Sequence, residues 1–187
     1  MLPPLAPFAT PRLLLRPLLP EDAPGMYALD SDPLVHRYLR GVGGAMVATL
    51  AESAATIRYI QAQYAAAGIG RWAVIEQASG QFAGWAGLKL VAGPVNGQRD
   101  FFDLGYRLRP PFWGRGYGYE AARAWLAAGF GALGLPRICA YADVHNTASR
   151  HILEKIGLQP GNEFSEGHTR CQWYEAAAPN AEPARPL

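Results

Sequence analysis

Three glycines at alternate positions mark the part of this sequence that is best suited to bind an anion. Gly114, Gly116 and Gly118 follow a short apolar run and precede an alanine-rich segment with helical spacing. Glycine leaves the backbone N–H groups uncovered, and the first N–H groups of a helix have no partner within the helix. The positive end of the helix dipole also favours negative charge there. The spacing therefore predicts a phosphate-binding turn, to which Arg109 and Arg115 add fixed positive charge.

The glycine spacing differs from two common nucleotide-binding motifs. One residue separates Gly116 from Gly118, whereas two residues separate the last glycines of the dinucleotide fingerprint G-x-G-x-x-G. No acidic residue closes a strand about 20 positions later, as contact with a ribose would require. No Gly-Lys-Ser or Gly-Lys-Thr follows, which excludes a P-loop. A plain surface turn and a nucleotide-dependent oxidoreductase both stay open as alternatives at this point.

The composition limits the class of protein. The chain has 187 residues, half of them apolar, a formal net charge of +2 and two cysteines. This length fits one domain that buries about 70% of its unfolded surface. The small net charge gives no reason to expect nucleic acid or an anionic membrane as a partner. Two cysteines cannot build a disulfide framework, so we expect Cys139 and Cys171 to be reduced and buried in strands, and we expect no metal site.

The two ends of the chain read as proline-rich extensions. Pro3, Pro4 and Pro7 interrupt the N-terminus, which lacks the basic start of a signal peptide, and no apolar run reaches about 18 residues. We therefore expect a cytoplasmic protein, monomeric or homodimeric. One domain over 10–178 lies between an arm over 1–9 and a tail over 179–187, neither of which is expected to bury a core.

Hydrophobic spacing and turn residues predict a mixed α/β order. Helices are expected over 20–30, from Thr49 to Gly68, over 117–133 and over 146–156, with a short piece near 33–39. Strands are expected over 12–18, 71–76, 81–91, 101–108, 137–144, from 158 onward and over 169–176. The second, third and fourth strands follow one another through tight turns. We therefore predict a largely antiparallel sheet of about seven strands with helices on both faces, rather than a doubly wound fold.

A second segment gives the glycine motif a context. The chain reads strand, Trp-Gly-x-Gly-x-Gly-x-Glu-Ala helix, strand, Asn-x-x-Ser helix and Leu-Glu-Lys-x-Gly, ending at Leu158. Over residues 10–176 this order resembles the GNAT superfamily of acyl-CoA-dependent N-acetyltransferases. The openings 10–18 and 31–38 also resemble its Rim-type subgroup, the ribosomal-protein N-terminal acetyltransferases. The superfamily's usual turn begins with Gln or Arg where this chain has Trp113, and the Rim-type subgroup typically has tryptophan there.

The resemblance implies a site for acetyl-CoA in a gap between the fourth and fifth strands, 101–108 and 137–144. Backbone groups of the fourth strand would bind the pantetheine amides as an added strand does, and the glycine turn would hold the pyrophosphate. Asn146 would bind the arm from the following helix, although a plain N-cap is a competing interpretation. The implied cofactor-binding set is Tyr106, Arg107, Leu108, Arg109, Gly114, Arg115, Gly116, Tyr117, Gly118, Asn146 and Arg150.

The implied chemistry is the attack of a neutral amine on a thioester. An α-amino group has an ordinary pKa of about 7.7–8.0 against about 10.4 for lysine, so an N-terminal amine needs less help in losing its proton. Asp103 is predicted to be the general base, acting through a water. A purely structural strand carboxylate is the competing interpretation, and Asp100 would take the role if the strand register differs.

The departing thiolate favours a general acid, because a free thiol has a pKa of about 8.5. Many superfamily members supply a tyrosine from the last helix, but the matching position here is Leu153, which carries no proton. Ser149 is the nearest substitute and is predicted to be the acid, with His145 and His151 as weaker candidates.

The identity of the amine acceptor stays open. We expect the segments 40–45 and 159–168 to select it, and Glu163 and Glu166 are their only acids, which favours a peptide or a small neutral amine over a polycation. Trp72 and Trp85 are equally consistent with the core and with the floor of a substrate site. Because the helical tyrosine is missing, a non-catalytic acyl-CoA-binding module is the alternative function.

Overall fold

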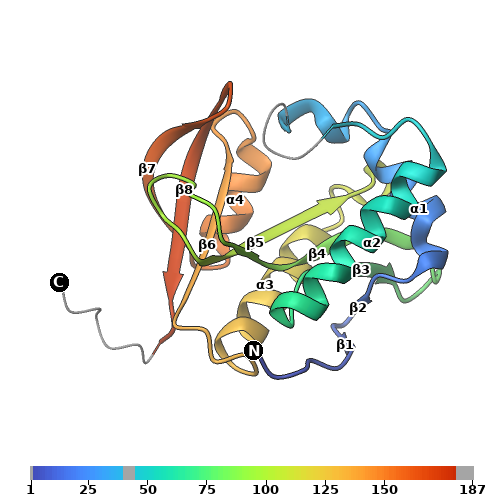
Figure 1. Ribbon diagram of the computed structural model, residues 1–187, viewed down its shortest axis with the longest axis horizontal. Coiled ribbons are helices and arrows are strands. Elements are labelled where there is room, and N and C mark those ends of the chain that lie inside the picture. Colours follow the sequence, from blue (N-terminus) through green and yellow to red (C-terminus); the bar gives the residue numbers. More distant parts are fainter. Residues whose placement is uncertain (1, 40–44, 180–187) are drawn as a thin grey trace.

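The computed structural model of this chain describes residues 2–39 and 45–179 and is built on a single twisted sheet (Figure 1). Eight strands lie in the order β1-β2-β3-β4-β5-β6-β8-β7, and all neighbours are antiparallel except β5 and β6. The strands are β1 Phe8–Ala9, β2 Leu13–Pro17, β3 Arg71–Glu76, β4 Phe82–Val91, β5 Phe101–Leu108, β6 Arg137–Asp143, β7 Gln159–Glu166 and β8 Thr169–Ala177. The predicted mixed, largely antiparallel sheet is confirmed, with one strand more than expected.

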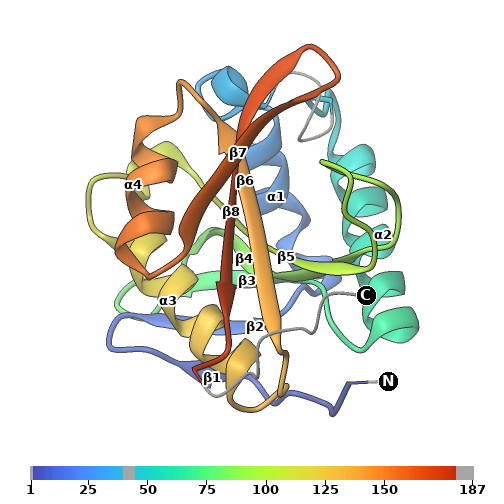
Figure 2. The same cartoon turned by 90° about the vertical axis from the view of Figure 1, so that its left-hand side faces the viewer.

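Helices cover both faces of this sheet (Figure 2). They are α1 Ala23–Asp30, α2 Leu50–Ala67, α3 Tyr117–Phe130 and α4 Thr147–Lys155, with short 3-10 turns η1 Pro20–Asp22, η2 Val35–Tyr38 and η3 Pro110–Phe112. On one face, Met26 of α1 and Ile57 of α2 pack with Ile75 of β3. On the other face, Trp125 of α3 and Leu153 of α4 belong to the larger core cluster. Within the described part of the chain, no helix is both long and apolar enough to cross a bilayer.

The helix ends follow local residue chemistry. Thr49 caps α2, because its side chain accepts a hydrogen bond from the Glu52 N–H at 3.2 Å, and Gly68 ends the helix with a left-handed φ of 76°. The α3 helix ends at Phe130, three residues before the predicted end at Leu133. Gly131 stops it there, although the apolar pattern of the sequence continues beyond that point.

The N-terminal arm belongs to the fold, which corrects the expectation that it buries no core. Phe8 and Ala9 form β1 and pair with β2, so that Phe8 lies opposite Leu15. The Phe8 ring centroid is 5.3 Å from that of Trp125 and 5.9 Å from that of Trp72. A two-residue strand between prolines has no hydrophobic periodicity, so only the tertiary contacts reveal it. The predicted tail lies outside the described residues except for Pro179.

β5 and β6 separate along most of their length. β5 pairs with β4 from Phe101 to Leu108, whereas it pairs with β6 only where Asp103 lies opposite Cys139. The C-terminal half of β5 therefore has a sheet neighbour on one side only, and the predicted gap between these two strands is confirmed. Cys139 and Cys171 are both buried and unbridged, as expected.

Candidate functional site

Two cavities meet at the gap between β5 and β6. One, of about 500 Å³, lies between the sheet and the helices α1 and α2, and we call it the α2-side cavity. The other, of about 520 Å³, adjoins the glycines before α3, and we call it the glycine-turn cavity. Six residues line both cavities and mark their junction, at the C-terminal end of β5: Tyr38, Leu39, Tyr106, Arg107, Asn146 and Ser149.

The backbone of β5 presents polar groups to this junction. The Arg109 N–H donates to the Ala83 carbonyl at 2.8 Å, and Arg107 is the next residue of β5 that points the same way. In an antiparallel ladder the intervening residues point to the other side, so the N–H and C=O groups of Tyr106 and Leu108 face the gap. The backbone of Arg107 faces β4 instead. The resemblance implied a pantetheine contact from this backbone, but its N–H and C=O groups point away from the gap.

The glycine turn has the backbone geometry of an anion site. Gly114 and Gly116 have φ angles of 69° and 79°, in the left-handed region that glycine adopts without strain, and Gly116 is the N-cap of α3. A Cβ on Gly118 would come within 3.2 Å of the Tyr106 ring. The N–H groups of the first turn, including that of Tyr117, have no acceptor within the helix. This turn lines the cavity that carries its name.

Two arginines predicted to hold a cofactor have other partners. Arg109 Nη1 donates to the Phe82 carbonyl at 2.9 Å. Arg150 donates from Nε to the Tyr174 hydroxyl and from Nη1 to the Val144 carbonyl, each at 3.1 Å, and the bond with Tyr174 raises the pKa of Arg150. Neither residue lines either cavity. Both predictions are corrected, because acceptors from other parts of the sheet occupy these guanidinium groups.

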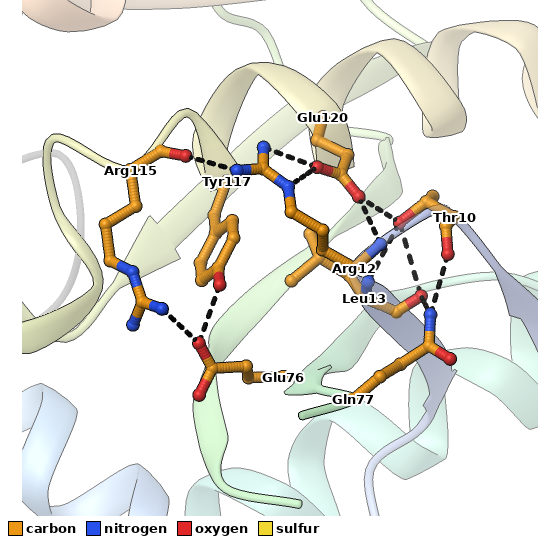
Figure 3. Close-up of polar contacts among 8 residues, drawn as sticks. All are labelled: Thr10, Arg12, Leu13, Glu76, Gln77, Arg115, Tyr117 and Glu120. Carbon is orange, nitrogen blue, oxygen red and sulfur yellow. Dashed lines mark hydrogen bonds and ion pairs between the residues drawn. The ribbon is translucent and has the colours of Figure 1, made fainter. Parts of the chain in front are cut away.

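The Arg115 side chain extends to Glu76 (Figure 3) and lines neither cavity. Its Nη2 is 2.7 Å from Glu76 Oε1, and the Tyr117 hydroxyl donates to the same oxygen at 2.6 Å. Hydrogen bonds, first from Ser79 and then from Tyr117, lower the pKa of Glu76. The bond to Glu76, followed by burial, raises the pKa of Tyr117. The predicted role of the Arg115 side chain at the cofactor is thus replaced by a structural one.

Arg12 of the loop before β2 ties the same turn to α3 (Figure 3). It donates from Nε to Glu120 Oε2 at 2.7 Å and from Nη1 to the Arg115 carbonyl at 2.8 Å. Burial alone would raise the pKa of Glu120, but hydrogen bonds from Thr10 and Arg12 outweigh it, so the net pKa is lowered. We call Arg12, Glu76, Arg115, Tyr117 and Glu120 the turn-support network.

The exposed residues Arg37 and His151 are the basic side chains that join Arg107 in lining the glycine-turn cavity. The sequence analysis missed Arg37, because it lies in η2, far along the chain from the glycines. An arginine in a short helical turn has no local sequence feature that would predict its position in this cavity. His145, the other histidine considered as an acid, is exposed and lines neither cavity.

Ser149 and Tyr106 bring two hydroxyl groups together at the junction. The Tyr106 hydroxyl lies 3.3 Å from Ser149 Oγ, and burial raises the pKa of Tyr106 to about 12, so the phenol keeps its proton at neutral pH. Asn146 Oδ1 accepts from the Ser149 N–H at 3.1 Å, which confirms Asn146 as the N-cap of α4. Leu153 is buried and lines the α2-side cavity. The sequence analysis considered only the backbone of Tyr106 and missed its phenol.

Asp103 lies in the α2-side cavity and is buried there in an ion pair. The guanidinium of Arg71 contacts Asp103 Oδ2 and donates from Nη1 to the Asp103 carbonyl at 2.7 Å. The strand carboxylate is therefore not exposed. Asp100 precedes β5, and the register places Asp103 directly opposite Lys89, so the alternative assignment to Asp100 is not supported.

The floor of the α2-side cavity carries a second ion pair around a tryptophan. Arg107 Nη1 lies 2.6 Å from Asp30 Oδ1 of α1. The Trp85 ring lies between Arg71 and Arg107, with their guanidinium carbons 5.2 and 5.1 Å from its centre. Trp72 instead meets Trp125 edge-on in the core at 5.1 Å. The structure thus assigns Trp85 to the cavity and Trp72 to the core.

The two segments expected to select a substrate differ in outcome. Residues 159–166 form β7, which pairs with β8 in a hairpin, and the segment contributes no residue to either cavity. The lining of the two cavities therefore gives no support to the prediction that this segment selects the acceptor. Of the other segment, residues 40–44 lie outside the described residues, and Ala45 lines the α2-side cavity.

Comparisons with known proteins agree with this geometry. The family model described as "Acetyltransferase (GNAT) domain" matches residues 12–159. An uncharacterized N-acetyltransferase of Bacillus subtilis, YoaA, is 28% identical over 170 residues, which cover 91% of this chain and 89% of YoaA.

Solved structures share the fold. A GNAT-family acetyltransferase from Bacillus anthracis has a TM-score of 0.76 at 22% identity, covering 92% of this chain and 99% of its own. RimL, a ribosomal L7/L12 alpha-N-protein acetyltransferase in complex with coenzyme A, has a TM-score of 0.75 at 15% identity, covering 90% of this chain and 95% of its own.

Replacing Glu76 and Glu120 together by glutamine should flatten the loss of stability in acid. Both carboxyls have a folded-state pKa below the ordinary 4.5, so their stabilisation is present above that pH and is lost as the pH falls through the lowered folded values. Urea unfolding at a series of pH values from about 3 to 6 measures the slope. A double variant with the wild-type slope would show that the turn-support network does not hold these carboxylates ionised.

Proposed function

Because this chain belongs to the GNAT acetyltransferase family, and is thereby an acyltransferase that uses acetyl-CoA, we propose that its acceptor is a primary amine. The amine attacks the thioester directly, without an acyl-enzyme intermediate. The observation that carries the proposal is the meeting of two cavities at the gap in the sheet. One cavity has uncovered backbone N–H groups at a helix start, and the other is lined by aromatic and charged side chains. This arrangement suits the acetyl donor, acetyl-CoA, in the glycine-turn cavity and the amine acceptor in the α2-side cavity.

The donor side fits coenzyme A through backbone groups. The N–H groups of the first turn of α3 hold the diphosphate at the positive end of the helix. The groups of Tyr106 and Leu108 that face the gap bind the pantetheine amides as a neighbouring strand would. The Leu108 carbonyl also accepts from the Trp113 indole at 2.7 Å, so Tyr106 and the Leu108 N–H carry most of this contact. Asn146 supplies amide N–H donors, because its cap uses only Oδ1.

Asp103 is the proposed general base. It lines the acceptor side of the junction, and a water between the amine and this carboxylate carries the proton. Arg71 fixes the carboxylate through Oδ2. An amine whose pKa lies near 8 is partly neutral at pH 7 and needs little assistance.

Ser149 is the proposed general acid, with Tyr106 behind it. As the amine nitrogen bonds to the thioester carbon, the carbon–sulfur bond breaks and the sulfur takes a proton. The Ser149 hydroxyl gives this proton and takes one from the Tyr106 phenol, 3.3 Å away. Water then returns a proton to Tyr106, whose raised pKa of about 12 favours the protonated phenol. The two hydroxyl groups thus replace the tyrosine hydroxyl that many superfamily members have at the position of Leu153.

A protein N-terminus is one candidate acceptor. The Rim-type resemblance of residues 10–18 and 31–38 supports it, as does the shared fold with RimL, whose own substrate is a ribosomal protein N-terminus. A small-molecule amine is the other candidate. The non-catalytic module would be favoured only if the protein binds acetyl-CoA and releases no thiol with any amine.

Gly116→Val should weaken coenzyme A binding at least about ten-fold, because a β-branched residue resists the left-handed backbone of this N-cap. Isothermal titration with coenzyme A measures the affinity. Gly134→Val is the matched control, since Gly134 has a φ of 60° in a loop outside both cavities and should keep the wild-type affinity. Equal affinities for the two variants would refute the placement of the diphosphate.

Asp103→Asn should lower turnover about a hundred-fold near neutral pH, because the proton of the amine loses its acceptor. The deficit should shrink above the pKa of the acceptor amine, where that amine is already neutral. Thiol release measured from pH 6 to 9 gives the profile, and the coenzyme A affinity shows that the variant is folded. A normal rate across this range would remove Asp103 from the mechanism.

Ser149→Ala should lower the turnover number by about a hundred-fold and leave the coenzyme A affinity within a factor of about two. Tyr106→Phe should give a smaller loss, because the serine hydroxyl remains. Thr147→Ala, which removes an exposed hydroxyl from the first turn of the same helix, is the control. If Ser149→Ala turns over as fast as Thr147→Ala, the serine is not the acid.

A further inference from the structure

The charged groups of the α2-side cavity do not balance one another. Among the described residues, its walls hold three cationic side chains, Arg71, Lys89 and Arg107, and two carboxylates, Asp30 and Asp103. Each carboxylate is ion-paired with one arginine. Lys89 is the remaining cation. Within residues 2–39 and 45–179, its ammonium group has no hydrogen-bond or ion-pair partner, and its side chain is half-buried.

The position of Lys89 makes this charge relevant to the acceptor. Lys89 lies on β4 directly opposite Asp103, and the side chains of a directly opposed pair leave the sheet on the same face, about 5 Å apart at Cβ. Burial, and then the charge of Arg71, lower the pKa of Lys89, while Asp103 opposes this shift. An anion beside the ammonium would oppose this lowering, because an opposite charge favours the charged form of lysine.

The remaining walls strengthen such a contact. Tyr38, Trp85 and Tyr141 line the same cavity, and aromatic walls reduce the screening of a charge pair by water. A polycationic acceptor would find no unpaired carboxylate among the described residues of this cavity. The positive charge of Lys89 would also repel such an acceptor.

We propose that the acceptor is a small molecule that carries a carboxylate together with its amine, and that Lys89 binds the carboxylate. This inference rests on the proposed function and names its substrate class. A carboxylate held by Lys89 keeps the acceptor beside Asp103, the proposed base, with the amine toward the junction. Lys89 is therefore a specificity-determining residue, and it takes no part in the proton transfers.

The kinetic test compares acceptors that differ in whether they carry the carboxylate. Phenylalanine, phenylalaninamide and phenethylamine are offered to the wild type, to Lys89→Met and to Lys89→Arg, with spermidine as the polycation. We expect wild-type kcat/KM to favour the carboxylate over the carboxamide at least about ten-fold, mainly through KM. In Lys89→Met the ratio should fall to about one, and in Lys89→Arg it should be largely kept.

Two kinetic outcomes overturn the proposal. One is a carboxylate preference that persists in Lys89→Met, and the other is a wild-type preference for phenethylamine or spermidine. The amide lowers the pKa of its amine and so favours reaction through chemistry alone. A preference for the carboxylate therefore reports binding.

A binding measurement separates this proposal from the proposed function. Lys89 and Lys155 are the lysines of the chain, so reductive methylation with an isotope label gives two lysine signals in addition to that of the N-terminus. Methylation keeps the charge. Phenylalanine should shift the Lys89 signal in a saturable way. Lys155, whose ammonium lies over the Tyr119 ring outside both cavities, should not respond.

Failure of the carboxylate site and failure of the acetyltransfer proposal give different results. A saturable Lys89 shift with no thiol release from any amine supports the carboxylate site and counts against the acetyltransfer proposal. Thiol release without a Lys89 shift, or with equal shifts for phenylalanine and phenylalaninamide, overturns the carboxylate site and leaves the acetyltransfer proposal standing.

Discussion

The separation of β5 from β6 is the constraint on which the rest of this structure depends. A strand inside a sheet normally satisfies its backbone on both sides, whereas β5 pairs with β6 only at the bridge between Asp103 and Cys139. The groups of Tyr106 and Leu108 that face the gap need partners of another kind. The Trp113 indole supplies one for the Leu108 carbonyl. The others are suited to an extended, amide-bearing ligand, which is what the pantetheine arm of the cosubstrate provides.

Several charged side chains around the site bond to the backbone or to other side chains. Arg12, Arg115 and Glu76 fix the glycine turn, while Arg109 and Arg150 bond to carbonyl groups and a phenol. A turn with left-handed glycines has few intrinsic restraints, so these contacts limit its conformations. The anion site then relies on oriented N–H groups, which require no reorganisation when a ligand arrives.

The two faces of the sheet divide the chemistry. Alternate residues of β5 point to opposite faces, so Tyr106 meets Ser149 beside α4 while Asp103 and Arg107 face α1 and α2. The proposed acid, Ser149, and the proposed base, Asp103, therefore lie on different sides of one strand. The strand itself provides the connection between them.

The sequence determined those features that depend on neighbouring residues. The left-handed turn at Gly114 and Gly116 follows because glycine alone enters that region without cost, and the caps at Thr49 and Asn146 follow from short polar side chains at helix starts. Order and spacing were also enough to predict a largely antiparallel sheet, and the resemblance to the GNAT superfamily implied the gap in it.

The tertiary structure decided everything that depends on a long side chain finding a distant partner. Arg71 and Asp103 are 32 positions apart, and Arg12 and Glu120 are 108 apart. A guanidinium reaches across several strands, so its acceptor depends on strand order and not on local sequence. For the same reason, three features could be found only in the tertiary structure. They are the unpaired charge of Lys89, the Tyr106 phenol beside Ser149 and the packing of Phe8.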